Sequence, residues 1–183
     1  MIPERFRAHI ERACDMFDIN TPARKRAFLA QIAHESAGFT KLEEDLGYGP
    51  AGLLRTFPRR FTPEEAVEYA HDHERIANRV YGGRMGNGPQ DGYRYRGRGL
   101  IQLTGRANYR RAGAALSLPL EDDPDLLLDP QVAAEVAAWF WADNGCNELA
   151  DDGKFEAITR RINGGLNGLD DRLAWYAKFD GVA

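Results

Sequence analysis

The chain is poor in the residues that build disulfide or metal frameworks. It has two cysteines, Cys14 and Cys146, which lie far apart, and four histidines with no cysteine cluster beside them. Two distant cysteines do not make a disulfide framework, so we expect both thiols to be reduced and buried. If they share a helix, His71 and His73 point to different faces of it. We therefore expect neither a metal nor a cofactor.

Long apolar runs are also missing. No stretch reaches the length that crosses a bilayer, and no charged-then-apolar leader opens the chain. We expect a protein that is made in the cytoplasm, stays there until something else releases it, and has no stable membrane insertion. Its 183 residues, 43% hydrophobic and 28% charged, fit a single globular domain over 1–183.

The net charge of −4 is unevenly spread. Seven arginines and one acid, Asp91, lie between Tyr81 and Arg111; the arginines are Arg84, Arg94, Arg96, Arg98, Arg106, Arg110 and Arg111. A solvated basic face is the simpler interpretation. Interleaved tyrosines leave nucleic-acid binding as an alternative, which the acidic chain and the lack of a known motif disfavour. We expect no nucleic-acid partner.

The remaining signals are mostly helical. Helix starts are indicated by Thr21-Pro22, by the capping box Thr62-Pro63-Glu64-Glu65 and by Asp129-Pro130, and one helix end by Gly164-Gly165. Two stretches, Glu43–Gly49 and Tyr81–Gly99, lack helical periodicity and are rich in acids or in glycine and aromatics. Irregular stretches of that length in a helical domain are more often functional than idle.

Two carboxylates are candidates for chemistry. Glu35 ends an apolar helical stretch, and a partly desolvated carboxyl keeps its proton, as a general acid must. The alternative is a surface glutamate that covers Phe39. Glu44, in the triplet Glu43-Glu44-Asp45, would supply a general base about 6.5–9.5 Å away if the reaction is an inverting hydrolysis; the alternative is a solvated acidic turn. Nucleophilic catalysis by Ser36 has no supporting motif.

Four segments together resemble the motifs of family 19 glycoside hydrolases, which include plant-type chitinases and many phage endolysins. They are Ala33-His34-Glu35-Ser36-Ala37-Gly38-Phe39, Glu44-x-Leu46-x-Tyr48, the long stretch Tyr95–Tyr109, and Thr159–Gly165. Leu100 stands where chitinases usually carry proline, which is typical of the endolysin branch.

The resemblance implies a mostly α, lysozyme-like domain of two lobes around a central catalytic cleft. It implies that Glu35 is the general acid, Glu44 the general base and Thr104 the hydroxyl that helps to hold the water. The residues that bind sugar or brace the site are then Tyr95, Gln102, Asn108, Asn163 and Arg172. Two alternatives stay open: Glu43 as the base, and Thr104 as a helix N-cap.

The leading hypothesis is an endolysin, a lysozyme-like monomer that cleaves the glycan strands of bacterial peptidoglycan in the periplasm after release. No separate wall-binding domain is expected. A chitinase acting on poly-N-acetylglucosamine shares all the catalytic parts. A lytic transglycosylase needs only one acid, so the Glu44 and Thr104 pair argues against it. A catalytically dead glycan-binding module would be expected to lack Glu35 or Glu44.

Overall fold

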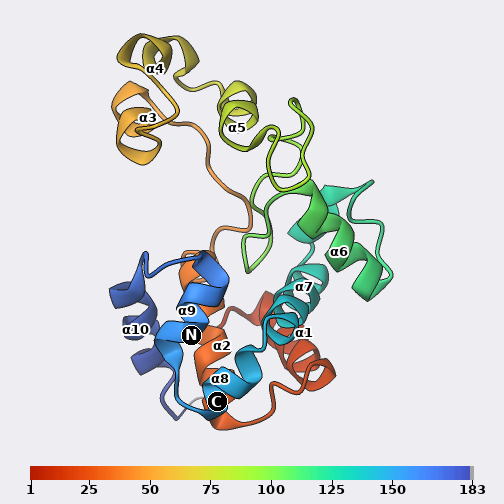
Figure 1. Cartoon of the computed structure of the whole chain (residues 1–183). Coiled ribbons are helices and arrows are strands. Elements are labelled where there is room, and N and C mark those ends of the chain that lie inside the picture. The colour runs from red at the N-terminus through yellow and green to blue at the C-terminus, as the bar shows by residue number, and fades with distance from the viewer. Residues whose placement is uncertain (182–183) are drawn as a thin grey trace. The chain divides into compact units, whose positions relative to one another are not determined.

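The computed structural model describes residues 1–181, and the regular structure of this part is helical, as the sequence predicts (Figure 1). The chain forms two compact units. Unit 1 comprises Met1–Leu42, Gly99–Gln102 and the chain from Asp125 onward; unit 2 comprises Glu43–Arg98 and Leu103–Pro124. No helix in residues 1–181 has both the length and the apolar character needed to span a bilayer.

Unit 1 is built around α2. Its helices are α1 (Glu4–Met16), α2 (Pro22–Glu35), α7 (Pro130–Asp143), α8 (Cys146–Asp151), α9 (Phe155–Asn163) and α10 (Leu169–Lys178), with a short 3-10 helix at Pro124–Leu128. Helix α2 packs on α10, α8 and α7, and α1 packs on α7 (Figure 1). Trp141 is fully buried and meets Phe28 edge-on at 5.5 Å. Burying each such ring contributes about 1.5–3 kcal/mol.

Unit 2 contains α3 (Pro50–Thr56), α4 (Pro63–Tyr69), α5 (His73–Tyr81) and α6 (Arg106–Leu116). Helices α3 and α4 pack together. The buried core beside them consists of Leu46, Leu53, Phe61, Ala66, Ile76, Ala77 and Val80. Tyr109 of α6 is buried and meets the Tyr95 ring at 5.4 Å.

The predicted helix starts are confirmed by their caps. The Thr21 hydroxyl accepts from the Arg24 N–H, and Asp129 Oδ1 accepts from the N–H groups of Gln131 and Val132. Thr62 and Glu65 form the reciprocal capping box. Each cap satisfies N–H groups that the first turn of a helix leaves without partners.

The two cysteines are free and buried, as expected. Cys14 lies on the apolar face of α1, and Cys146 begins α8. Burial raises the pKa of each thiol from 9.0 to about 12. Both thiols therefore pack as small apolar groups.

Two antiparallel β-bridges bring the acidic segment beside the central motif in unit 2. One joins Glu43 to Arg98 and the other joins Arg98 to Leu103. Because antiparallel partners advance in opposite directions, this register places Gly97 opposite both Glu44 and Thr104. The Glu44 N–H donates to the Gly97 carbonyl at 2.9 Å, in agreement with that register.

Candidate active site

Glu35 is the last residue of α2 and is held by a buried arginine from α10. Arg172 is 1% exposed, and its Nη2 donates to Glu35 Oε1 at 2.5 Å. The Glu35 side chain is 18% exposed, so its carboxyl is neither a surface group nor a core group. Arg172 donates to Oε1 and not to Oε2, so this ion pair occupies one of the two carboxyl oxygens.

A chain of buried polar groups fixes Arg172. Its Nη1 donates to Gln31 Oε1 at 2.5 Å, and Gln31 Nε2 donates to the Thr159 hydroxyl at 2.9 Å. Gln31 and Thr159 are both fully buried. A buried guanidinium costs free energy unless its donors are used, so this chain keeps Arg172 in one orientation.

The turn after Glu35 has a strained backbone. Ala37, Gly38 and Phe39 all have left-handed φ angles of 48°, 70° and 65°. Ser36 stabilises the turn, because its hydroxyl donates to the Ile32 carbonyl and accepts from the Phe39 N–H. The Ser36 hydroxyl is thus used by the fold, and the strain lies beside the candidate acid.

Glu44 lies in unit 2, where both of its carboxylate oxygens accept hydrogen bonds. The Tyr81 hydroxyl donates to Oε1 at 2.5 Å, and the Gly97 N–H donates to Oε2 at 3.2 Å. Burial and the neighbouring carboxylate raise the pKa of the Tyr81 hydroxyl, so this hydroxyl stays protonated and donates. Each Glu44 oxygen keeps a second lone pair for a water.

Glu43 differs from Glu44 in its partner, which is an arginine. Its Oε1 accepts from Nε and Nη2 of Arg96, and the Arg96 guanidinium lies 4.0 Å from the centre of the Tyr93 ring. A carboxylate in a two-donor ion pair with arginine is a poor proton acceptor. The geometry therefore favours Glu44 over Glu43 as the base.

Thr104 does not cap α6, contrary to that alternative. The N-cap is Gly105, at φ 92°, and no side chain of its own caps the helix. Thr104 lies one residue earlier, and its carbonyl accepts from Asn108 Nδ2 at 2.8 Å. Asn108 thus uses its amide nitrogen to hold the Thr104 turn and keeps Oδ1 as an acceptor.

Tyr95 is buried, so we withdraw it from the residues expected to touch sugar. It is 3% exposed, its ring packs on Tyr109, and its hydroxyl donates to the Glu121 carbonyl at 2.9 Å. Its carbonyl accepts from the Gly105 N–H at 2.8 Å. Tyr95 therefore braces the segment that leads into α6, the second role that the resemblance allows.

Asn163 and Gln102 belong to unit 1 and both bind backbone. Asn163 Nδ2 donates to the Asn167 carbonyl, which also accepts from Arg172 Nε, both at 3.3 Å. This loop links exposed Asn163 to the arginine that holds Glu35. Gln102 has a left-handed φ of 52°, and its Nε2 donates to the Gly99 carbonyl at 3.0 Å.

Each unit thus holds one candidate carboxylate, Glu35 in unit 1 and Glu44 in unit 2. The family model described as chitinase class I, of glycoside hydrolase family 19, matches residues 12–152. A glycosyl hydrolase family 19 domain-containing protein of Haemophilus influenzae is 44% identical over 153 residues, covering 81% of this chain and 74% of that protein. The chain belongs to glycoside hydrolase family 19.

Two further relatives of this family 19 enzyme are plant and bacterial chitinases. An Arabidopsis thaliana endochitinase is 46% identical over 92 residues, which are 46% of this chain and 32% of that protein. The structure is similar to chitinase C from Streptomyces griseus, with a TM-score of 0.65 and 24% identity, over 98% of this chain and 70% of that chain. The structural likeness confirms the lysozyme-like, mostly helical fold, and the family makes the protein a chitinase-like glycoside hydrolase.

Two residues of the candidate site were missed by sequence reasoning. Gln31 stands as a lone polar side chain in the apolar run Phe28–Ala33, a pattern that signals a buried partner. Tyr81 opens the irregular stretch already marked as functional, but nothing local connects it to Glu44, which is 37 residues away.

The predicted solvated basic face holds for only part of the segment: Arg84, Arg94, Arg110 and Arg111 are exposed. Arg96 and Arg98 are buried at 9% and 2% exposure. Arg106 and Arg110 both bind Glu121, which lowers the pKa of that carboxyl to about 2. The arginines of the central motif therefore brace the enzyme's own backbone and acids.

His71 and His73 do not share a helix. His71 has a left-handed φ of 64° and precedes α5, which His73 begins. His71 Nδ1 lies 3.2 Å from the Gly47 carbonyl, and a Cβ on Gly47 would lie 2.9 Å from His73 Nε2. Both rings thus pack on the segment that follows Glu44.

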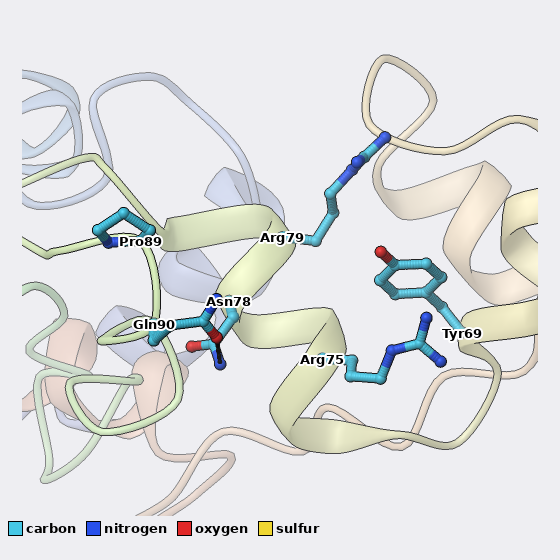
Figure 2. Close-up of a pocket in the computed structure, with 6 residues that line it drawn as sticks. All are labelled: Tyr69, Arg75, Asn78, Arg79, Pro89 and Gln90. Carbon is cyan, nitrogen blue, oxygen red and sulfur yellow. Dashed lines mark hydrogen bonds between the residues drawn. The ribbon is translucent and has the colours of Figure 1, made fainter.

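A cavity of about 320 Å³ beside α5 is lined by Tyr69, Arg75, Asn78, Arg79, Pro89 and Gln90 (Figure 2). Its guanidiniums are neutralised within unit 2, because Arg75 binds Glu68 and Arg79 binds Glu65. Neither candidate carboxylate lines it. Figure 2 shows its other wall, where Asn78 Nδ2 donates to Gln90 Oε1.

Proposed function

We propose that this family 19 enzyme hydrolyses β-1,4 bonds in the glycan strands of bacterial peptidoglycan, with inversion. The observation that carries the proposal is that two half-buried carboxylates are each held by fixed donors. Arg172 holds one oxygen of Glu35, and Tyr81 with the Gly97 N–H holds Glu44. A positioned acid and a positioned base are the parts that inverting hydrolysis requires.

The reaction then proceeds in one displacement. Glu35 Oε2 gives its proton to the glycosidic oxygen, which takes the electron pair of the breaking C1–O bond. A water attacks C1 from the opposite face and loses a proton to Glu44, with Thr104 as a second partner for that water. Solvent returns a proton to Glu35 and removes one from Glu44. The products are a free hydroxyl and an α-anomeric reducing end.

The endolysin role is a further part of the proposal. Leu100 in the central motif is typical of the endolysin branch, and a bacterial relative matches most of this chain. We propose that the enzyme acts as a monomer on the wall from the periplasm, after release from the cytoplasm of the producing cell. The second candidate function is chitin hydrolysis, which the names of the plant relatives favour.

Product analysis tests substrate and mechanism together. Purified peptidoglycan and a chitin hexasaccharide are digested, and the products are examined by mass spectrometry and by proton NMR before mutarotation. Hydrolysed products with a new α-anomeric end on peptidoglycan support the proposal. Anhydro-sugars would indicate a transglycosylase, a β anomer would exclude Glu44 as base, and activity on chitin alone would favour the second candidate.

Matched glutamine variants test the assignment of the base. Glu44→Gln removes the proton acceptor, so we expect nearly all activity to be lost. Glu43→Gln weakens only the ion pair with Arg96, so we expect a far milder effect. A severe Glu43→Gln defect beside a mild Glu44→Gln one would move the base by one residue and leave the inverting mechanism in place.

A further inference from the structure

One buried amide in unit 2 joins the residue that holds Glu44 to the turn that carries Thr104. Asn87 is 7% exposed and lies in the loop between α5 and α6. Its Nδ2 donates to the Tyr81 carbonyl at 3.0 Å, and its Oδ1 accepts from the Arg106 N–H at 2.8 Å. The amide nitrogen therefore binds the end of α5, and the amide oxygen binds the start of α6.

The Arg106 contact replaces a missing helix cap. Helix α6 begins at Arg106, and its N-cap, Gly105, has no side chain to accept the first N–H groups. The loop supplies the acceptors instead: Asn87 Oδ1 for the Arg106 N–H and the Met85 carbonyl for the Ala107 N–H at 3.0 Å. The start of α6, and with it the preceding Thr104, thus depends on the loop.

Two glycines, one at each end of the loop, lie close to their neighbours. A Cβ on Gly82 would lie 2.3 Å from the Asn78 carbonyl oxygen, and one on Gly105 would lie 2.5 Å from Met85 Cβ. The middle of the loop is held to α5, because Asn78 Nδ2 donates to Gln90 Oε1 (Figure 2). The Asn78 Oδ1 atom also accepts from the Tyr93 N–H. These contacts limit the movement of the loop on both sides of Asn87.

We propose that Asn87 is a positioning residue for hydrolysis, which keeps the Tyr81 hydroxyl and the Thr104 turn in register so that both face the same water. The proposal rests on the roles proposed for Glu44 and Thr104. The hydrogen bonds of Asn87 go to the backbone of Tyr81 and Arg106, so it acts on Glu44 and Thr104 through Tyr81 and α6. Its loss should lower kcat and leave KM nearly unchanged, because the groups that it aligns act on the water and not on the sugar.

The test is Asn87→Asp, which separates the two arms of the amide. A carboxylate still accepts from the Arg106 N–H at the start of α6, but it has no N–H to give to the Tyr81 carbonyl. We expect the variant to fold and kcat to fall by about 10- to 100-fold, the loss typical of a small misplacement of reacting groups. KM should stay within about a factor of two on the substrate that the wild type hydrolyses.

Asn147 offers a matched control. It is 8% exposed, its Oδ1 accepts from Trp141 Nε1 at 2.8 Å, and its Nδ2 donates to the Phe17 carbonyl at 3.0 Å. Asn147→Asp thus makes the same chemical change at equal burial, but in unit 1, away from either carboxylate's contacts. Both variants should lose thermal stability, and only Asn87→Asp should lose kcat.

A double-mutant cycle shows whether Asn87 acts through Tyr81. If it does, Asn87→Asp should change kcat little further in a Tyr81→Phe background. Any of three results would overturn the inference. They are an unchanged kcat in folded Asn87→Asp, an equal loss of kcat in Asn147→Asp, and effects of Asn87→Asp and Tyr81→Phe on kcat that are fully additive. Asn87→Ser, whose hydroxyl makes one bond, replaces Asn87→Asp if the latter does not fold. A Glu44→Gln variant that stays active would instead overturn the role proposed for Glu44, on which this inference rests.

Discussion

Replacing Arg172 by methionine should destabilise unit 1 and disable the acid. The change removes a buried cation whose three donor atoms are bonded to Glu35, to Gln31 and to the Asn167 carbonyl. Methionine keeps much of the packing volume, so the loss is mainly electrostatic. Removing one partner of a buried ion pair costs about 3–5 kcal/mol, because the other charge is left without compensation.

The magnitude can be divided between the two side-chain acceptors, Glu35 and Gln31. The Glu35 side chain is 18% exposed and can recruit water, whereas Gln31 is fully buried and loses its donor outright. An orphaned buried acceptor costs about 1–3 kcal/mol, so Gln31 accounts for a large share of the total. In a Glu35→Gln background, Arg172→Met leaves no carboxylate without its partner. The loss in the free energy of unfolding should then be about 1–2 kcal/mol smaller.

Urea unfolding followed by circular dichroism measures all four proteins of this cycle. A loss under about 1 kcal/mol in Arg172→Met, or equal losses with and without Glu35, would refute the view that the ion pair and Gln31 organise the surroundings of Glu35. Activity is measured in parallel at a temperature at which Arg172→Met is folded. It should be close to that of Glu35→Gln, because an untethered carboxyl no longer presents Oε2 to the leaving oxygen.

Three further outcomes are expected. Tyr81→Phe keeps the ring but removes a hydrogen bond to a charged group, worth about 1.5–3 kcal/mol, so hydrolysis rates should fall by at least about tenfold; an unchanged rate would remove Tyr81 from the site. The raised pKa of Cys14 and Cys146, about 12 against 9.0, means that unfolded thiols ionise before folded ones. Stability should therefore be full below pH 9 and fall toward pH 12, by about 1 kcal/mol per pH unit for each thiol, and the double Cys→Ala variant should flatten this decline in urea unfolding. Hydrolysis should survive a chelator, since two carboxylates suffice, and rescue of a chelated sample by a divalent ion would contradict this.

Helix starts were predictable where the cap lies within the same turn. Thr21, Thr62 and Asp129 each accept from an N–H group no more than three residues away. The start of α6 carries no such signal, because its acceptor, Asn87, stands 19 residues earlier in the chain. Short helices of this kind depend on tertiary partners rather than on local propensity.

The candidate site shows the same limit. Glu35 and Glu44 were accessible through the motif resemblance, but the residues that hold them lie 137 and 37 residues away. For Tyr95 the sequence left open whether the residue binds sugar or braces the site, because an aperiodic, glycine-rich stretch gives no pattern that separates core from surface. Only its contacts with Tyr109 and the Glu121 carbonyl reveal that it is buried.

The discontinuous make-up of unit 1 sets an order of events during synthesis. The contacts that brace Glu44 all fall between residues 44 and 97, so they can form while the ribosome is still translating the rest of the chain. Glu35 emerges earlier, yet its brace waits for α10 and Arg172. Helices α1 and α2 likewise wait for α7 and α10 to complete their packing. A nascent or truncated chain that ends before α10 therefore has the contacts that hold Glu44 and lacks the arginine that holds Glu35.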